Sequence, residues 1–337
     1  MKGILFVLLC LLINLSFFSN GFSEPIKKKL DFSRKISLNN HNWKIAADSQ
    51  NKGIQEKWFE SPPVKDAQST PIPWIIQDIF HNYHGVAWYW CEFDLPGETI
   101  KNGHYLLTFQ AVDYKSDIWI NGQYTGNHEG GETPFEFDIT KNLKKEGSNL
   151  LVVRVLNPTY EPIDGIALKE TPSGAKNYPF GGNASYNTGG IIGDVEIYEK
   201  PSVQISNLYV CPDWKTGNVK LQVPVLNQNA KKVKSSLLIN ISEVRSGLPV
   251  LIQRFDRNIK QDKDTLIYEV SILDHKLWSI GNPNLYRVSV SIEYNNSVDE
   301  SVTRFGFRDF RFINGYFQLN GKRIFLKGSN FSTHYPI

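Results

Sequence analysis

The sequence predicts an all-β protein built from antiparallel β-sandwiches. Almost every periodic segment alternates apolar and polar residues with period two, which is the pattern of strands, and helical periodicity is nearly absent. Asn121-Gly122 stands between two short strand patterns. Asn-Gly is the strongest short hairpin signal, because a type I′ turn needs a positive φ at both central positions. Many short strands separated by polar turns favour sandwiches.

The first 23 residues are expected to precede the fold. They contain Lys2, an apolar run from Ile4 to about Phe18, and small residues around Gly21. This pattern predicts a secretory signal peptide at residues 1–23. The apolar run is shorter than the roughly 18 to 20 residues needed to cross a bilayer, which argues against an uncleaved anchor. We therefore expect a secreted or periplasmic protein with no membrane segment after the signal is removed.

Residues 24–200 hold the first set of predicted strands. In the segment 85–95, Val86, Trp88 and Trp90 lie on one face of a strand, and the alternate apolar residues lie on the other. Trp88 and Trp119 both fall within strand patterns, so core packing is favoured over a role as sugar platforms. A long Gly-rich loop separates the strand pattern near residue 150 from the last one, near residue 195.

Residues 201–304 hold a second set of strands, which begins after Pro201. Alternation is clear in 219–225 and again in 286–292. About 105 residues without a Cys…Trp…Cys spacing fit an immunoglobulin-like sandwich that lacks the disulfide. In residues 305–337, two short strand candidates surround Asn314-Gly315 and Asn320-Gly321 and lead into an apolar strand pattern at 324–326.

Composition excludes several classes of function. The 37 basic and 34 acidic residues are scattered, so no basic track for nucleic acid is present. Cys91 and Cys211 lie in apolar strand patterns, where burial as free thiols is favoured over a disulfide. Neither has the His and Cys neighbours of a zinc site. No phosphate-binding loop or metal-ligand cluster occurs, so no metal or cofactor is expected.

Seven segments occur in an order that resembles the N-terminal half of glycoside hydrolase family 2, the family of β-galactosidases, β-glucuronidases and β-mannosidases. They are GVAWYWCEFDLP, VDYKSDIWINGQYTGNHEGGETPFEFDIT, NLLVVRVLNP, GGIIGDVEIY, LWSIGNPNLYRVSV, FGFRDF and FQLNGKRIFLKGSN. The resemblance implies a jelly-roll sugar-binding domain at 24–200 and an immunoglobulin-like domain at 201–304. It also implies that 305–337 hold a linker and the first strand of a (β/α)8 TIM-type catalytic barrel.

The chain departs from the family pattern at two places. Ile192 stands where the family commonly has Trp, a change that keeps apolar character. Gly328 and Asn330 match the family's G-x-N-R-H-E, but Phe331, Ser332 and Thr333 replace its Arg, His and Glu. The second departure argues against borrowing a substrate from the best-known galactosidases and suggests a divergent branch.

No catalytic residue is predicted in this chain. Retaining hydrolysis needs two carboxyl groups about 5 to 5.5 Å apart. The resemblance places both on later barrel strands, and a barrel takes roughly 250 residues, whereas 32 follow residue 305. The acidic pairs Glu129/Glu132 and Glu136/Asp138 lie beside a hairpin loop, where a solvated or turn-capping role is favoured over catalysis.

Five residues are candidate substrate contacts. Asn183, Tyr186 and Asn187 lie in the Gly-rich loop 179–191 and could offer hydrogen bonds and a stacking face to a sugar. Asn330 and His334 resemble positions at the barrel rim. For the loop, the alternative is a surface segment that seals the sandwich against its neighbour.

The expected function is the non-catalytic N-terminal part of a secreted glycosidase. The complete enzyme would hydrolyse O-glycosidic bonds, with a glycoside as its partner molecule and a homo-oligomer as a further expectation. The alternative is a free-standing carbohydrate-binding protein of two sandwiches without catalysis. A third is a scaffold that completes a barrel supplied by a second chain.

Overall fold

The structure, a computed structural model, describes residues 34–60, 65–97, 99–171, 176–177 and 185–329. Strands dominate it, with one short helix, α2 (Ile76–Ile79), and one 3-10 turn, η1 (Leu168–Glu170). The all-β prediction is confirmed. The predicted signal peptide at 1–23 lies outside the described residues. No helix in the described ranges has the length and apolar character needed to cross a membrane.

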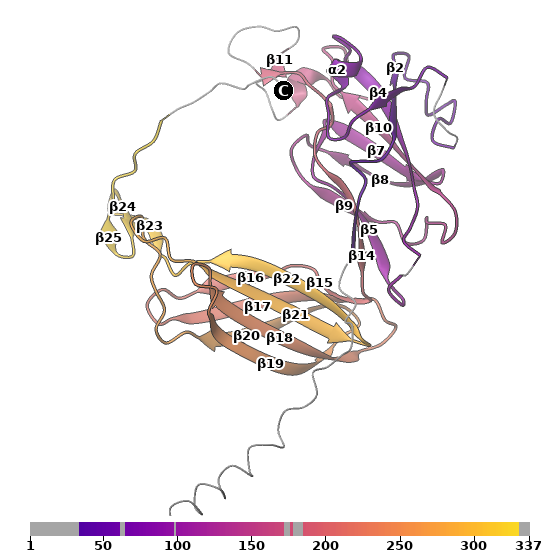
Figure 1. Cartoon of the computed structure of the whole chain (residues 1–337). Helices are drawn as coiled ribbons and strands as arrows, with labels where there is room; N and C mark the ends of the chain where they lie inside the picture. Colours follow the sequence, from indigo (N-terminus) through magenta and orange to yellow (C-terminus); the bar gives the residue numbers. More distant parts are fainter. Residues whose placement is uncertain (1–33, 61–64, 98, 172–175, 178–184, 330–337) are drawn as a thin grey trace, which may run out of the picture. The chain divides into compact units, whose positions relative to one another are not determined.

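The first sandwich pairs a six-stranded antiparallel sheet with a four-stranded one (Figure 1). The six-stranded sheet runs in the order β3 (Gln68–Thr70), β2 (Trp43–Asp48), β4 (Gly85–Phe93), β10 (Asn149–Asn157), β7 (Lys115–Ile120) and β8 (Gln123–Glu129). The four-stranded sheet runs β1 (Arg34–Ser37), β14 (Val195–Lys200), β5 (His104–Phe109) and β9 (Phe135–Asp138). Two small pairs complete it: β6 (Val112–Asp113) with β13 (Gly190–Ile191), and β11 (Lys176–Asn177) with β12 (Ser185–Tyr186).

The core of this sandwich lies between its two sheets. Alternate residues of β4, among them Ala87, Tyr89 and Cys91, pack there against Leu107 and Ile197 of the facing sheet. The turn between β7 and β8 is the predicted Asn121-Gly122, with φ of 52° and 78°. Alternation and turn chemistry therefore fix the register of these strands, as the sequence predicts.

The other face of the six-stranded sheet is buried as well. Trp88, Trp90 and Trp119 form a second cluster there, covered by Trp58 and Phe59. Phe59 stacks on Trp119 with ring centroids 5.2 Å apart. Trp88 is 0% and Trp119 6% exposed, so the prediction that both pack in a core is confirmed.

The second sandwich also has two antiparallel sheets (Figure 1). One runs β19 (Pro249–Ile259), β18 (Val233–Glu243), β21 (Tyr286–Tyr294) and β22 (Ser297–Phe305). In the other, β17 (Asn218–Asn227) pairs with β15 (Val203–Ile205), β16 (Tyr209–Pro212) and β20 (Asp262–Ser271). The predicted alternations of β17 and β21 point into the shared core, which includes Val219, Leu221, Val288 and Val290.

Among the described residues, Cys91 and Cys211 are both free thiols, but only Cys91 is buried. Cys91 lies in the core of the first sandwich, where burial raises the pKa of its thiol to about 12. The prediction that Cys211 is also buried is wrong, because its side chain is exposed. Cys211 sits on β16, where Tyr209 and Cys211 share the exposed face of the strand.

A three-stranded sheet follows the second sandwich, with strands β23 (Phe310–Ile313), β24 (Tyr316–Leu319) and β25 (Lys322–Arg323). Its turns are the predicted Asn314-Gly315 and Asn320-Gly321, both with positive φ. Asn320 attaches it to the second sandwich, because its Nδ2 donates to the Trp278 carbonyl at 2.9 Å.

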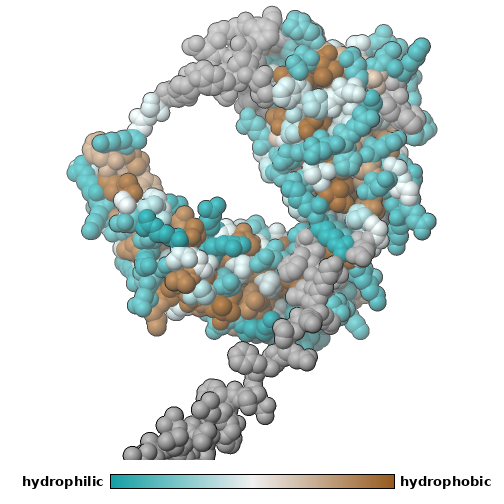
Figure 2. Space-filling model, in the orientation of Figure 1, coloured by the Kyte–Doolittle hydropathy of each residue, from teal (hydrophilic) through white to brown (hydrophobic). Residues whose placement is uncertain are grey.

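The pattern at 324–326 predicts a strand, but β25 ends at Arg323. Ile324 N donates to the Phe317 carbonyl of β24 at 2.9 Å, but no strand is formed by the described residues beyond Arg323. Phe325 is 80% and Phe312 66% exposed. Figure 2 accordingly shows apolar surface over β23–β25.

We predict that Ile239→Ala in β18 lowers the free energy of unfolding by about 2–5 kcal/mol, because Ile239 is fully buried and its loss leaves a cavity. Ile252→Ala on the neighbouring strand β19 is the control: Ile252 is 61% exposed and should change stability by less than about 1 kcal/mol. Urea unfolding followed by circular dichroism measures both. Equal effects would contradict this assignment of the core.

Candidate functional site

Two polar networks in the first sandwich are centred on residues of strand β10. The polar clamp consists of Gln77, His84, Asn157 and Asn187. The arginine network is centred on Arg154. A single Arg inside the apolar run NLLVVRVLNP is the sequence signal that could have found the second network. Loop composition alone predicts neither the polar clamp nor the arginine network.

Asn157 is the centre of the polar clamp. It is fully buried, and its Oδ1 accepts from Gln77 Nε2 at 2.9 Å and lies 2.9 Å from His84 Nδ1. Its Nδ2 donates to Asn187 Oδ1 at 3.0 Å. Burial lowers the pKa of His84, against a smaller opposite effect of the bond to Asn157. Because its pKa is lowered from the usual value, the ring is mainly neutral at pH 7.

Asn187, a predicted sugar contact, is 3% exposed. Besides its bond from Asn157, it donates through Nδ2 to the carbonyl of Pro158 at 2.8 Å. Both ends of its amide are thus engaged inside the fold. This geometry makes Asn187 a structural residue that holds the base of the Gly-rich loop.

The other predicted contacts are placed only in part. Tyr186 belongs to β12, which pairs in parallel with β11. Asn183, Asn330 and His334 lie outside the described residues, so their roles stay predictions. Within the described chain, the structure brings none of these residues together with another predicted contact except the neighbours Tyr186 and Asn187.

Backbone bonds tie the end of the Gly-rich loop to the segment before β4. Gly189 N donates to Gln77 Oε1 at 3.1 Å, and its carbonyl accepts from Ile76 N at 2.8 Å. Gly190 has φ of +138°, and a Cβ there would lie 2.7 Å from the Trp74 carbonyl oxygen. Only glycine fits that position, which explains why the chain has Gly there.

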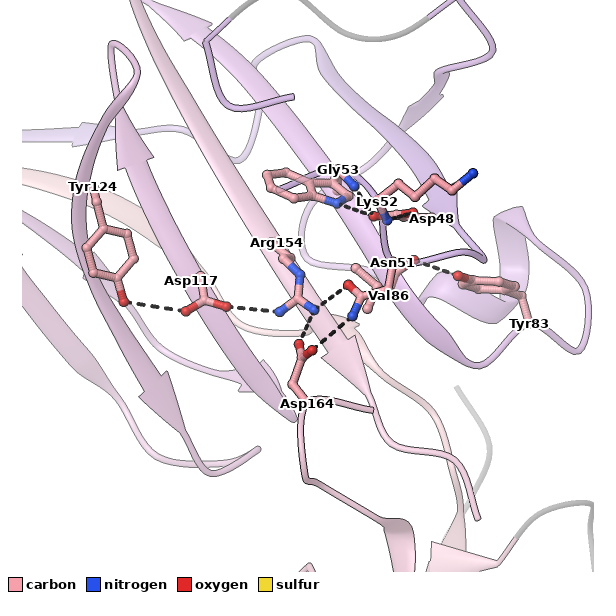
Figure 3. A network of polar contacts seen from close by, with 11 residues as sticks. Asp48, Asn51, Lys52, Gly53, Tyr83, Val86, Asp117, Tyr124, Arg154 and Asp164 are labelled. Atoms are coloured by element: carbon pink, nitrogen blue, oxygen red, sulfur yellow. Dashed lines mark hydrogen bonds and ion pairs between the residues drawn. The ribbon is translucent and has the colours of Figure 1, made fainter. Parts of the chain in front are cut away.

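The arginine network pairs one buried cation with two carboxylates (Figure 3). Arg154 is 2% exposed, and its Nη1 donates to Asp117 Oδ2 at 3.1 Å. Its Nη2 donates to Asn51 Oδ1 at 2.8 Å and forms a close ion pair with Asp164. Asn51 also donates to Asp164 at 2.9 Å, which closes a ring of contacts.

The network holds two loops against the outer face of the six-stranded sheet. Burial tends to raise the pKa of Asp164, but the charge and hydrogen bonds of Arg154 outweigh this and hold that pKa below its usual value. Nearby, Asp48 accepts from Lys52 N, Gly53 N and Trp88 Nε1 at 2.8–3.0 Å. These bonds fix the segment that covers the Trp cluster.

The described residues offer no catalytic carboxyl pair in either network. The acidic residues Glu129, Glu132, Glu136 and Asp138 are exposed, in agreement with the prediction that they are solvated. Among the described residues, no group of three or more His, Cys, Asp or Glu could hold a metal ion. The networks can position loops and can exclude water from the sheet, but they contain no tuned acid and base.

Two family models match this chain. Residues 62–201 match the model described as "Glycosyl hydrolases family 2, sugar binding domain", and residues 203–308 match the model described as "Glycosyl hydrolases family 2". Together these matches cover more than two thirds of the chain.

Curated relatives are much longer than the matched region. A beta-galactosidase of Thermoanaerobacterium thermosulfurigenes is 29% identical over 317 residues, which are 90% of this chain and 41% of that protein. A putative beta-glucuronidase of Formosa agariphila is 31% identical over 72% of this chain and 27% of its own length. The chain therefore spans less than half of these relatives.

Solved structures share the fold. Bacteroides uniformis beta-glucuronidase 2, covalently bound to cyclophellitol-6-carboxylate aziridine, aligns with a TM-score of 0.71 and 23% identity over 88% of this chain and 35% of that chain. The β-glucuronidase of Ruminococcus gnavus in complex with D-glucuronic acid gives a TM-score of 0.67 and 24% identity over 91% of this chain and 51% of that chain.

We predict that Asn187→Ala lowers the free energy of unfolding by about 1–3 kcal/mol, because it leaves buried polar groups of Asn157 and Pro158 without partners. Asn127→Ala, on an exposed part of β8, should stay within about 0.5 kcal/mol of the parent protein. Thermal and urea unfolding measure both variants. An Asn187 variant as stable as the parent would argue against the clamp.

The Arg154–Asp164 pair should make stability depend on acid. Since the folded-state pKa of Asp164 is lowered, its contribution is present above the unfolded value of about 3.9 and is lost as pH falls through the folded pKa. Asp164→Asn should therefore be less stable than the parent at pH 7, and the difference should shrink progressively below about pH 4.

Urea unfolding at pH 7, 5, 4 and 3 tests this. Asp256→Asn is the control, because Asp256 and its partner Lys234 are 61% and 73% exposed and such pairs contribute less than about 1 kcal/mol. The role of the ion pair would be contradicted if the Asp164 variant and the parent differed in stability by the same amount from pH 7 down to pH 3.

Proposed function

Because the chain belongs to glycosyl hydrolase family 2, we propose that it is the non-catalytic N-terminal part of a secreted glycosidase. The observation that carries this proposal is the extent of the match: the two family models match residues 62–201 and 203–308, and the chain covers only 27–41% of the curated relatives. The part of those relatives that this chain does not cover is longer than the roughly 250 residues that a (β/α)8 barrel needs.

The proposed reaction of the complete enzyme is hydrolysis of terminal β-galactosides, β-glucuronides or related glycosides. The names of the relatives support this substrate class, since they are beta-galactosidases and beta-glucuronidases. Two carboxyl groups at the rim of the barrel would act as proton donor and nucleophile. The two sandwiches would support the barrel, and Asn157 would anchor the described end of the Gly-rich loop through Asn187.

A second candidate function is carbohydrate binding without catalysis. The description of the model matched by residues 62–201 as a sugar binding domain favours it. Under this proposal the two sandwiches would act as a free-standing secreted binder. The two candidates differ in whether a longer product of the same gene cleaves glycosides.

The test compares two proteins with chromogenic 4-nitrophenyl β-galactoside and β-glucuronide. The chain of residues 24–337 should release no 4-nitrophenol above the buffer blank, because it lacks the carboxyl pair. The product of the complete reading frame, including any codons beyond 337, should release it readily. The proposal would be overturned if the short chain released 4-nitrophenol and this release were lost when one of its acidic residues is changed. A gene that ends at codon 337 would leave the second candidate.

A further inference from the structure

The second sandwich has a long sheet edge that no other described strand covers. Strand β19 (Pro249–Ile259) has 11 residues and lies at the end of its sheet, where β18 is its one partner among the described strands (Figure 1). The free side of an edge strand presents unpaired backbone N–H and C=O groups, which can pair with a strand of another chain. This edge belongs to the second sandwich alone.

Most of β19 lacks the devices that keep an edge strand from pairing. Such strands are commonly short, or carry Pro, a bulge or Lys. In β19 the irregular register with β18 and the single Pro, Pro249, both lie before residue 251. Residues 251–259 pair with β18 without interruption and contain no Lys. This stretch is therefore a regular template for a further strand.

The charges on the outer face of β19 are complementary to themselves. Arg254 and Asp256 lie two positions apart, so they share a face, and their side chains are 59% and 61% exposed. When two copies of β19 pair antiparallel about Phe255, Arg254 of each copy lies opposite Asp256 of the other. Pairing about Arg254 or about Asp256 would instead place like charges opposite each other, which is destabilising.

The charges behind these two residues continue the pattern. Asp256 Oδ2 lies 3.2 Å from Lys234 Nζ of β18, and Arg254 Nη1 lies 3.7 Å from Glu293 Oε2 of β21. Across the junction of two copies, the signs would alternate from Lys234 and Asp256 of one copy to Arg254 and Glu293 of the other. Each charge then has opposite charges as neighbours, which favours this register over the others.

The inner face of β19 fits the same register. Phe255 is half-buried, and its ring centroid lies 4.6 Å from that of Tyr268. The Arg257 guanidinium covers both rings, 5.6 Å and 5.4 Å from their centroids. In the paired copies, Phe255 would face Phe255, and aromatic pairs opposite each other stabilise antiparallel strands. Gln253 would face Arg257, whose N–H groups its Oε1 can accept.

We infer that β19 binds β19 of a second copy of this chain, antiparallel, with Phe255 on the two-fold axis. Two four-stranded sheets would then form one continuous sheet, and the same surface of each copy would be used, as in most homodimers. A single pair of strands buries a small area, so the dimer should exchange with monomers at micromolar concentration. The inference does not rest on the proposed glycosidase function. It gives a surface and a register to the homo-oligomer that is expected from the sequence.

Charge reversal tests the register. Sedimentation velocity of the purified chain over the micromolar range, at low ionic strength, measures the monomer–dimer equilibrium. Arg254→Asp places two acidic groups opposite each other twice in the dimer and should weaken association about tenfold or more. Adding Asp256→Arg to this variant restores opposite charges and should restore association. Glu269→Arg, on the exposed face of β20 in the other sheet, is the control and should leave the equilibrium unchanged.

A disulfide tests the position of the axis. Opposite Cα atoms in antiparallel strands lie about 4.5–5.5 Å apart, which a disulfide can bridge. Phe255→Cys, in a Cys211→Ser background that removes the exposed thiol, should therefore form a covalent dimer under mild oxidation, seen on a non-reducing gel. Gln253→Cys in the same background should not, because its counterpart would lie four residues along the strand, about 14 Å away.

Circular dichroism of each variant separates loss of association from loss of the fold. A parent chain that stays monomeric throughout the micromolar range would overturn the inference. So would a folded double variant that fails to regain the association lost in Arg254→Asp, or equal cross-linking of the two Cys variants. Phe312→Ser tests the exposed apolar side chain of β23 as the alternative interface. Association that is lost in this variant but kept in Arg254→Asp would also contradict the role of β19.

Discussion

The first sandwich depends on the burial of both faces of its six-stranded sheet. One face packs on the four-stranded sheet, as in any sandwich. The other face carries Trp88, Trp90 and Trp119, whose large apolar area must also be removed from water. The segment around Trp58 and Phe59 packs over these three Trp side chains and removes them from water. Asp48 then fixes that segment through its bonds to Lys52, Gly53 and Trp88.

This double burial explains the polar networks. A loop that covers a sheet brings polar backbone and side-chain groups into a region without water, and each must find a partner. Arg154 emerges from β10 on the outer face and is neutralised by Asp117 and Asp164. Asn157, three residues later, joins the segment before β4 to the end of the Gly-rich loop. The same strand therefore organises the cover of the sheet and the base of the loop.

The contrast between satisfied and unsatisfied polar groups connects structure with function. In the clamp and the arginine network nearly every polar atom has a partner, which is the mark of groups that serve the fold. Among the described residues, Oε1 of the half-buried Gln228 is a buried oxygen without a hydrogen-bond partner. Phe312 of β23 and Phe325, which follows β25, are large apolar side chains that remain exposed to water. The chain spans less than half of its curated relatives, which bear additional length that could cover such a surface.

The sequence by itself determined which segments are strands, where the Asn-Gly turns lie, which residues of β4 share a face and which side of β17 faces the core. These are local properties, because alternation and turn chemistry are written in neighbouring residues. The order of seven segments was sufficient to indicate the family. Two predictions from the sequence were wrong: that Cys211 is buried and that residues 324–326 form a strand. Both exposure and strand pairing depend on neighbours distant in the chain.

Only the tertiary structure decided the roles of polar residues. Asn187 looked like a sugar contact in a Gly-rich loop, but Asn157 and Pro158 occupy its amide. A side chain's function depends on which groups from remote segments reach it, and a hydrogen bond between residues 30 or 100 positions apart leaves no periodic trace in the sequence.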